Sequence, residues 1–159
     1  MKAKSRSLIG CPVNEEAYKV DLELQDRYTA YSAEILRLAL LGIAGYGFLL
    51  KDLVFAEHAP TTFAHRAHDA WYLLICGALC LGFSAVLALQ HRLCATECVA
   101  CVASYLRKNA CGRAEEAEAD RGALRANLRK AALLLRLSAL LLALGAGSVV
   151  ATFCYVLWQ

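Results

Sequence analysis

Three long apolar stretches follow one another along the chain. The first covers residues 35–50 and holds one charge, Arg37, and the second covers residues 70–90 and holds none. The third covers residues 131–158, where Arg136 is the single charged residue. A helix needs about 20 apolar residues to cross the hydrocarbon core of a bilayer. The second and third stretches meet that length, and the first falls short of it.

The first stretch becomes long enough when residues 53–56 extend it beyond Lys51 and Asp52, two charges that can pair or snorkel to the interface. The chain is therefore predicted to be an all-α integral membrane bundle. Its transmembrane helices are expected at about residues 35–56, 70–90 and 131–158. A soluble bundle with buried helices is the alternative, but a charge-free run as long as the second stretch is rare in soluble folds.

Helical periodicity continues outside these stretches. Asn14 can cap a helix whose apolar positions, such as Ala17 and Tyr28, recur toward residue 34. The same region alternates at Val20, Leu22 and Leu24 as a strand would, but a lone strand would have no partner. We therefore expect a cytoplasmic amphipathic helix at about 14–34, after a flexible N-terminus at 1–13.

The segment between the second and third stretches is predicted to form a cytoplasmic helical hairpin at about 91–130. Its turn is expected at Cys111 and Gly112, because glycine commonly ends a helix. Acidic residues follow in the first turns of the next helix, where the helix dipole favours them. With an outer loop at 57–69, residues 14–159 form a single membrane domain with cytoplasmic helical extensions.

Composition supports a membrane protein. Hydrophobic residues make up 59% of the 159 residues and charged residues only 19%, and the mean hydropathy is +0.45. Disorder is excluded, because disordered chains have low hydrophobicity. A net charge of +3, with basic residues beside apolar runs, argues against a nucleic-acid partner. The lipid bilayer is the expected partner.

Lysine and arginine positions predict the orientation. Both the N-terminal segment and the long middle segment are rich in these residues, whereas the first loop holds two, Lys51 and Arg66. The N-terminus is therefore expected in the cytoplasm and the C-terminus outside the plasma (inner) membrane. Aromatic residues at the predicted outer interface agree with this orientation; they are Trp71, Tyr72, Tyr155 and Trp158.

Small residues recur within the spans, and they let helix backbones approach closely in lipid. The candidate packing residues are Gly42, Gly45, Ala78, Gly82, Ala139, Ala143, Gly147 and Ala151. In the third span these residues form a continuous face. The opposite side, with Leu135, Leu142, Val149 and Val156, is expected to suit lipid. The small face could pack inside one chain or between copies, and a homo-oligomer is favoured.

A basic stripe precedes the third span. Arg121, Arg125 and Arg129 are spaced by four residues, and Lys130 follows them. They are candidates for binding anionic lipid head groups, which attract basic residues near the surface. The alternative is a solvated face that only sets topology.

Two groups of residues are candidates for metal chemistry. Cys94, Cys98 and Cys101 lie close together just after the second span, and His65 and His68 lie one helical turn apart in the outer loop. Cysteines at such positions are more often small, polarizable packing residues, and reversible acylation is a further alternative. No metal and no cofactor are predicted.

No catalytic set of residues is recognisable, and the chain is predicted not to be an enzyme. It has no Gly-rich phosphate loop, no HExxH and no Gly-x-Ser-x-Gly sequence. We expect it to act through helix–helix assembly, as a homo-oligomer or as a small subunit of a membrane complex. A cysteine-based metal or redox protein is an alternative.

The layout resembles that of SLATT domains, two-span membrane effectors of bacterial defence systems. The resemblance covers residues 14–110, from an amphipathic helix containing DRYTAYSAEILR, through a membrane hairpin, to a long cytoplasmic helix. It is one of arrangement, and the third span departs from the two-span pattern. The resemblance implies an oligomeric pore-forming effector, and no functional residues are carried over from it.

Overall fold

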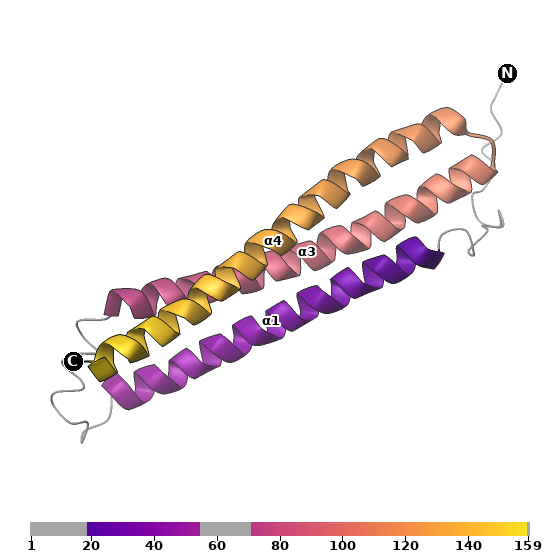
Figure 1. Cartoon of the computed structure of the whole chain (residues 1–159). Coiled ribbons are helices and arrows are strands. Elements are labelled where there is room, and N and C mark those ends of the chain that lie inside the picture. Colours follow the sequence, from indigo (N-terminus) through magenta and orange to yellow (C-terminus); the bar gives the residue numbers. More distant parts are fainter. Residues whose placement is uncertain (1–18, 55–70, 159) are drawn as a thin grey trace. The chain divides into compact units, whose positions relative to one another are not determined.

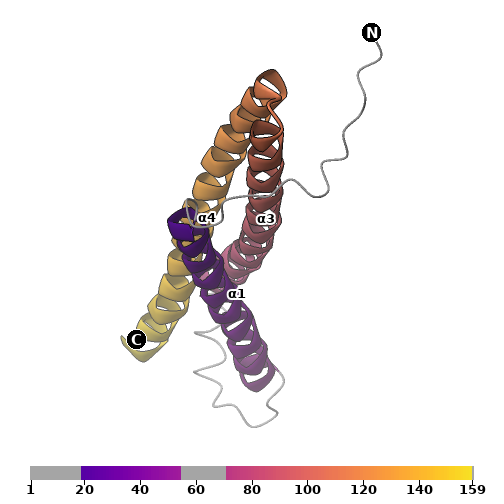
Figure 2. The same ribbon diagram turned by 90° about the vertical axis from the view of Figure 1, so that its right-hand side faces the viewer.

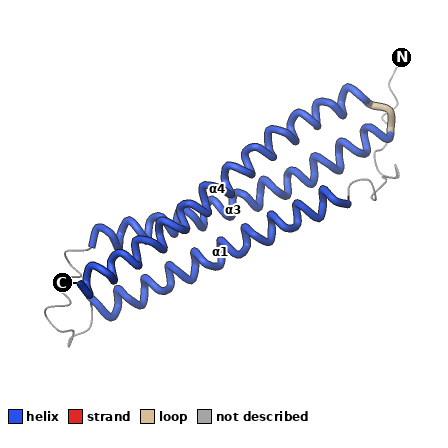
Figure 3. The backbone as a smooth tube through the Cα atoms, in the orientation of Figure 1, coloured by secondary structure: helices blue, strands red, loops and turns tan. Residues whose placement is uncertain are grey.

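The computed structural model describes residues 19–54 and 71–158, and the described residues form three α-helices. Helix α1 is Lys19–Val54, α3 is Trp71–Ala110 and α4 is Ala114–Trp158 (Figure 1). The described ranges contain no strand, and residues 111–113 form their single non-helical stretch (Figure 3). The predicted all-α fold is confirmed, and the strand alternative near Val20 is wrong. The expected N-terminal tail and outer loop lie outside the described residues.

The chain divides into two compact units, where a single membrane domain was expected. Of the described residues, unit 1 holds 19–30 and 91–132, and unit 2 holds 31–54, 71–90 and 133–158. Each helix contributes one segment to each unit. The divisions fall within a few residues of the positions where the sequence predicts the change from cytoplasmic to apolar segments.

Two helices, α3 and α4, are long and apolar enough to cross a membrane. Three such helices were expected, and within the described residues α1 does not reach the same combination of length and hydropathy. The described part of α1 ends at Val54. Phe55 and Ala56, on which the first span depended for its length, lie outside the described residues.

The turn between α3 and α4 lies where the sequence predicts it, in unit 1. Figure 2 shows the two helices running away from this turn side by side. Gly112 has a φ of 73°, a left-handed conformation that residues with a Cβ avoid. The Arg113 amide reaches back to the Lys108 carbonyl at 3.0 Å, and the Cys111 amide reaches the Arg107 carbonyl at 3.0 Å. These bonds satisfy carbonyl groups at the end of α3, as in a Schellman-type cap.

Unit 2 has a core to which all three helices contribute. One cluster joins Ile35 of α1, Ala88 of α3 and Leu135 of α4. A second cluster joins Tyr46 of α1 to Leu74 and Leu81 of α3. Because each cluster draws on more than one helix, the unit is a packed three-helix bundle and not a set of independent hairpins.

The core overturns one expectation about α4. Leu135 is buried in the first cluster, Leu142 packs against both clusters, and Val149 packs against the second. The side of α4 that was expected to face lipid is therefore the side that packs inside the chain. Helical spacing alone marks the residues that share a face, but it does not say which face turns inward. The fourth residue of that set, Val156, lies outside the residues whose side chains are described.

Gly112 offers a test of the turn. We expect Gly112→Ala to lower the free energy of unfolding by about 1–2 kcal/mol, the cost of placing a Cβ in the left-handed region. Gly122→Ala is the matched control, because Gly122 lies exposed inside α4 with no other atom within 4 Å of an added Cβ. This control should gain about 1 kcal/mol from helix propensity. Chemical unfolding in detergent, followed by circular dichroism, measures both values, and equal stabilities would contradict the assigned turn.

Candidate helix-packing site

The closest packing in unit 2 surrounds Leu81 of α3, whose side chain is only 2% exposed. A Cβ added at Gly42 of α1 would lie 2.7 Å from Leu81 Cδ1, and a Cβ added at Gly145 of α4 would lie 2.7 Å from Leu81 Cγ. Both distances are shorter than real Cβ contacts. The two glycines therefore provide the space that the Leu81 side chain occupies.

One helical turn before Leu81, Gly77 lies against a pair of hydroxyl groups. A Cβ added at Gly77 would overlap Tyr46 Oη and Ser148 Oγ, which are hydrogen-bonded to each other at 3.0 Å. The Gly77 carbonyl oxygen would in turn lie 3.2 Å from a Cβ at Gly145. Because Gly77 of α3 and Gly145 of α4 have no side chain, Tyr46 of α1 can form a hydrogen bond with Ser148 of α4.

A second polar contact joins α3 to α4. Ser84 Oγ donates to the Ser138 carbonyl oxygen at 2.8 Å, and both side chains are fully buried. Ser138 Oγ donates to the Leu135 carbonyl oxygen of its own helix at 2.9 Å. Interhelical hydrogen bonds in membranes average about 0.6 kcal/mol each. Each such bond therefore contributes little to stability beside close packing.

The predicted packing residues divide into two sets. Gly42 belongs to the packing site, and Ala139 packs against the Ile35 cluster. Ala78 is half-buried. Five predicted packing residues do not pack closely against another helix in this chain. An added Cβ would meet no atom within 4 Å at Gly45, Gly82 or Gly147. The side chains of Ala143 and Ala151 are exposed.

Gly77 and Gly145 contact other helices closely, but the spacing of small residues did not predict them as packing residues. A signal for Gly145 was present in the hydroxyl residues at helical spacing with it, Ser138 and Thr152. All three are buried on one side of α4. Because a hydroxyl group needs a partner in an apolar environment, these residues mark the inward face better than small size alone.

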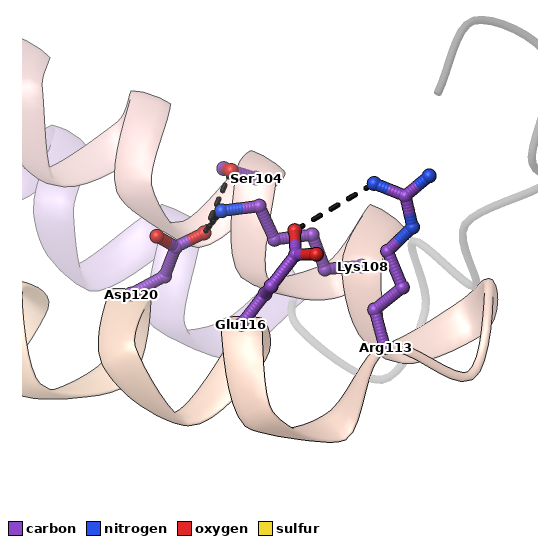
Figure 4. Close-up of polar contacts among 5 residues, drawn as sticks. All are labelled: Ser104, Lys108, Arg113, Glu116 and Asp120. Carbon is purple, nitrogen blue, oxygen red and sulfur yellow. Dashed lines mark hydrogen bonds and ion pairs between the residues drawn. The ribbon is translucent and has the colours of Figure 1, made fainter. Parts of the chain in front are cut away.

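Unit 1 is held by a charged contact near the α3–α4 turn (Figure 4). Lys108 Nζ lies 2.7 Å from Asp120 Oδ2, and Ser104 Oγ donates to the same oxygen at 2.7 Å. The side chains of Lys108 and Asp120 are only 19% and 23% exposed. The hydrogen bond from Lys108 lowers the pKa of Asp120 below its usual value, and the hydrogen bond from Ser104 lowers this pKa to a smaller extent. The carboxylate therefore stays charged at neutral pH and links the two helices.

The α1 segment of unit 1 is tied to α3 by a different contact. Gln25 Nε2 donates to the Ala95 carbonyl oxygen, which has a free lone pair beyond its helical bond. Side-chain hydrogen bonds thus join helices in both units, and unit 1 adds an ion pair between α3 and α4.

The basic stripe lies on the exposed surface of unit 1. Arg121, Arg125, Arg129 and Lys130 are all exposed. Arg121 Nη1 lies 3.5 Å from Glu118 Oε2. Within the part of the chain that the structure describes, Arg125, Arg129 and Lys130 form no ion pair.

Among the described residues, the candidate cysteine ligands do not assemble into a metal site. No group of three His, Cys, Asp or Glu side chains among the described residues is placed to hold a metal ion. Cys98 is buried, while Cys94 and Cys101 are half-buried, and all three are free thiols on α3. Their spacing on one helix puts them in a row, and a metal needs ligands around a point. His65 and His68 lie outside the described residues.

His91 lies on α3. Its side chain is 3% exposed. Its Nδ1 atom has no hydrogen-bond partner in the described structure. We find no physical account of this placement.

Comparison of this chain with known protein families, curated proteins and solved structures gives no match. The packing site is therefore supported by its geometry alone.

The packing site can be tested with a pair of glycines two residues apart on α4. Gly145→Ala should lower the unfolding free energy by about 1–3 kcal/mol, because overpacking forces neighbouring atoms to shift. The neighbouring atoms are those of buried Leu81 and the Gly77 backbone. Gly147→Ala is the control, and it should leave the unfolding free energy of the detergent-solubilised monomer unchanged or slightly raised, since within one chain its Cβ meets no atom within 4 Å. Thermal unfolding in detergent compares the two variants, and a larger loss for Gly147→Ala would contradict the observed register.

Proposed function

We propose that this chain is a small, non-enzymatic integral membrane protein that acts through helix–helix assembly. The observation that supports this most directly is the apolar surface of unit 2. Large apolar side chains are more than half exposed on each of its helices; they include Leu41, Phe48, Leu79, Phe83, Leu140 and Val150. Burial of apolar surface away from water contributes about 25 cal/mol per Å², so a surface of this kind favours a lipid environment.

The low burial of the apolar segments of α3 and α4 also supports a lipid environment. Only 33% of the most apolar segment of α3 and 17% of that of α4 is buried inside the chain. The apolar helices of a soluble core would be mostly buried by their neighbours. Lipid chains are the surroundings that suit such helices, because an α-helix satisfies its own backbone hydrogen bonds.

We further propose that α1 makes a third crossing. Its apolar side chains from Leu38 to Phe48 are largely exposed, as on the other two helices. Arg37 pairs with Glu34 at 2.7 Å, so the charge nearest the start of the apolar segment has a counter-charge one turn away. With three crossings the N-terminus lies in the cytoplasm and the C-terminus outside the inner membrane.

Reporter fusions test this topology. Fusions at residue 60 and at the C-terminus should report an external location, and a fusion at residue 112 should report the cytoplasm. The physical reason is the excess of lysine and arginine in the middle segment, which is retained on the cytoplasmic side. A cytoplasmic signal from the C-terminal fusion would contradict three crossings in this orientation.

The assembly surface is proposed on the exposed small residues of α4, which are Ala143, Gly147 and Ala151. Their side chains are too small to hold another helix away, and lipid provides no hydrophobic force to separate or join helices. A second copy of the chain is the favoured partner, and a different membrane subunit is the alternative. No nucleic acid is proposed as a partner.

Gly147→Leu tests assembly through this surface. The leucine should reduce a homo-oligomer to a folded monomer, because the added side chain prevents close backbone contact at a cost of about 1–3 kcal/mol. Gly47→Leu is the control, because Gly47 is exposed on α1 with no atom within 4 Å of an added Cβ. Mass measurement in detergent compares both variants with the unaltered chain. An unchanged oligomer in Gly147→Leu would contradict this surface.

A further inference from the structure

Charges are segregated along the unit 1 part of α4. Its four acidic side chains all precede Arg121; they are Glu115, Glu116, Glu118 and Asp120. Three of them already have partners: Asp120 pairs with Lys108, Glu116 with Arg113 at 3.6 Å, and Glu118 with Arg121 at 3.5 Å. Among the basic residues that follow, Arg121 has a partner, whereas Arg125, Arg129 and Lys130 form no ion pair within the described ranges.

The basic residues of this segment form one surface. Arg121, Arg125 and Arg129 are spaced by four residues on a continuous helix, so they lie on the same face with about 5–6 Å between successive Cβ atoms. All three are exposed, as are Lys130 and the apolar side chain of Leu128 beside them. Arg125 and Arg129 have no ion pair within the described ranges. Guanidinium groups at this spacing can each bind a phosphate group through two hydrogen bonds.

We propose that Arg125 and Arg129, supported by Arg121 and Lys130, bind the phosphate groups of anionic lipids. This inference rests on the proposed function, because it needs α4 to enter a membrane. The basic surface ends at Lys130, and the apolar stretch starts at the next residue. In sequence, the two unpaired arginines therefore lie within two helical turns of the start of the span.

Two other partners fit this surface less well. A second copy of the chain would bring arginine against arginine, and like charges repel. A nucleic acid would leave exposed Leu128 without a suitable contact, whereas the boundary between head groups and acyl chains accepts both arginine and leucine. Charge complementarity and the adjoining apolar segment thus favour an anionic lipid.

The test measures lipid binding by the full chain in neutral detergent. Phosphatidylglycerol is titrated onto the protein and followed by native mass spectrometry, with phosphatidylcholine as the neutral lipid. Each basic residue near a membrane surface contributes about 1 kcal/mol, which is about fivefold in affinity. Arg125→Gln combined with Arg129→Gln should therefore weaken phosphatidylglycerol binding about 25-fold and leave phosphatidylcholine binding unchanged.

Two further variants guard against indirect effects. Arg27→Gln combined with Arg107→Gln removes the same charge from other exposed positions of unit 1, and this control should change binding by less than about twofold if the site is local. Arg125→Lys combined with Arg129→Lys keeps the charge and should retain most of the binding. A loss as large in the control as in the test variant would overturn a local site.

The remaining outcomes separate the proposals from one another. If the unaltered chain and the glutamine variant bind phosphatidylglycerol equally well, the lipid site is overturned. The proposed membrane insertion is not affected by this result. Competition by millimolar inorganic phosphate overturns lipid specificity, and tight binding of a short DNA duplex by the same arginines overturns the choice of partner. Extraction of the chain from membranes by alkaline carbonate overturns the proposed function itself.

Discussion

The packing of Leu81 between two glycines is the contact on which the structure of unit 2 depends. The side chain occupies space that Gly42 of α1 and Gly145 of α4 leave open, so one residue of α3 sets its separation from both other helices. Gly77 then lies close enough for Tyr46 and Ser148 to meet beside it. Because closely packed interiors do not absorb even one extra methyl group without strain, this contact also determines the register of the three helices.

The arrangement of polar groups follows from that close packing. Hydroxyl groups are buried inside unit 2, as at Ser84 and Ser138, and the outer surface carries large apolar side chains. In water this distribution would expose apolar area and bury polar atoms, which is unfavourable on both counts. In lipid the exposed apolar surface carries no such cost. The hydroxyl groups of Ser84, Ser138 and Thr152 each donate to a carbonyl oxygen. The proposed membrane location thus accounts for the inside and the outside of unit 2 together.

Charged side chains contribute to the helix contacts of unit 1. Its α3–α4 contact is ionic, with Asp120 accepting from both Lys108 and Ser104. Most acidic residues of α4 are engaged in such pairs, whereas Arg125 and Arg129 have no ion pair within the described ranges. One helix therefore carries a compensated charge cluster, an uncompensated basic surface and an apolar segment in that order. This order suits a helix that passes from water, through the phosphate groups of the lipids, into the hydrocarbon core.

Composition and hydrophobic periodicity by themselves determined the helical class, the extent of α3 and α4, the turn at Gly112 and the positions where the two units divide. These features are local, because they depend on the hydropathy of consecutive residues and on the conformational freedom of one glycine. Tertiary structure alone decided which small residues of α4 pack against another helix. Small residues occur on two of its faces, Gly145 on one and Gly147 on the other, and spacing cannot distinguish them. The distinction comes from Leu81, a side chain 64 positions away from Gly145 along the sequence, whose contact exists only after the helices have packed.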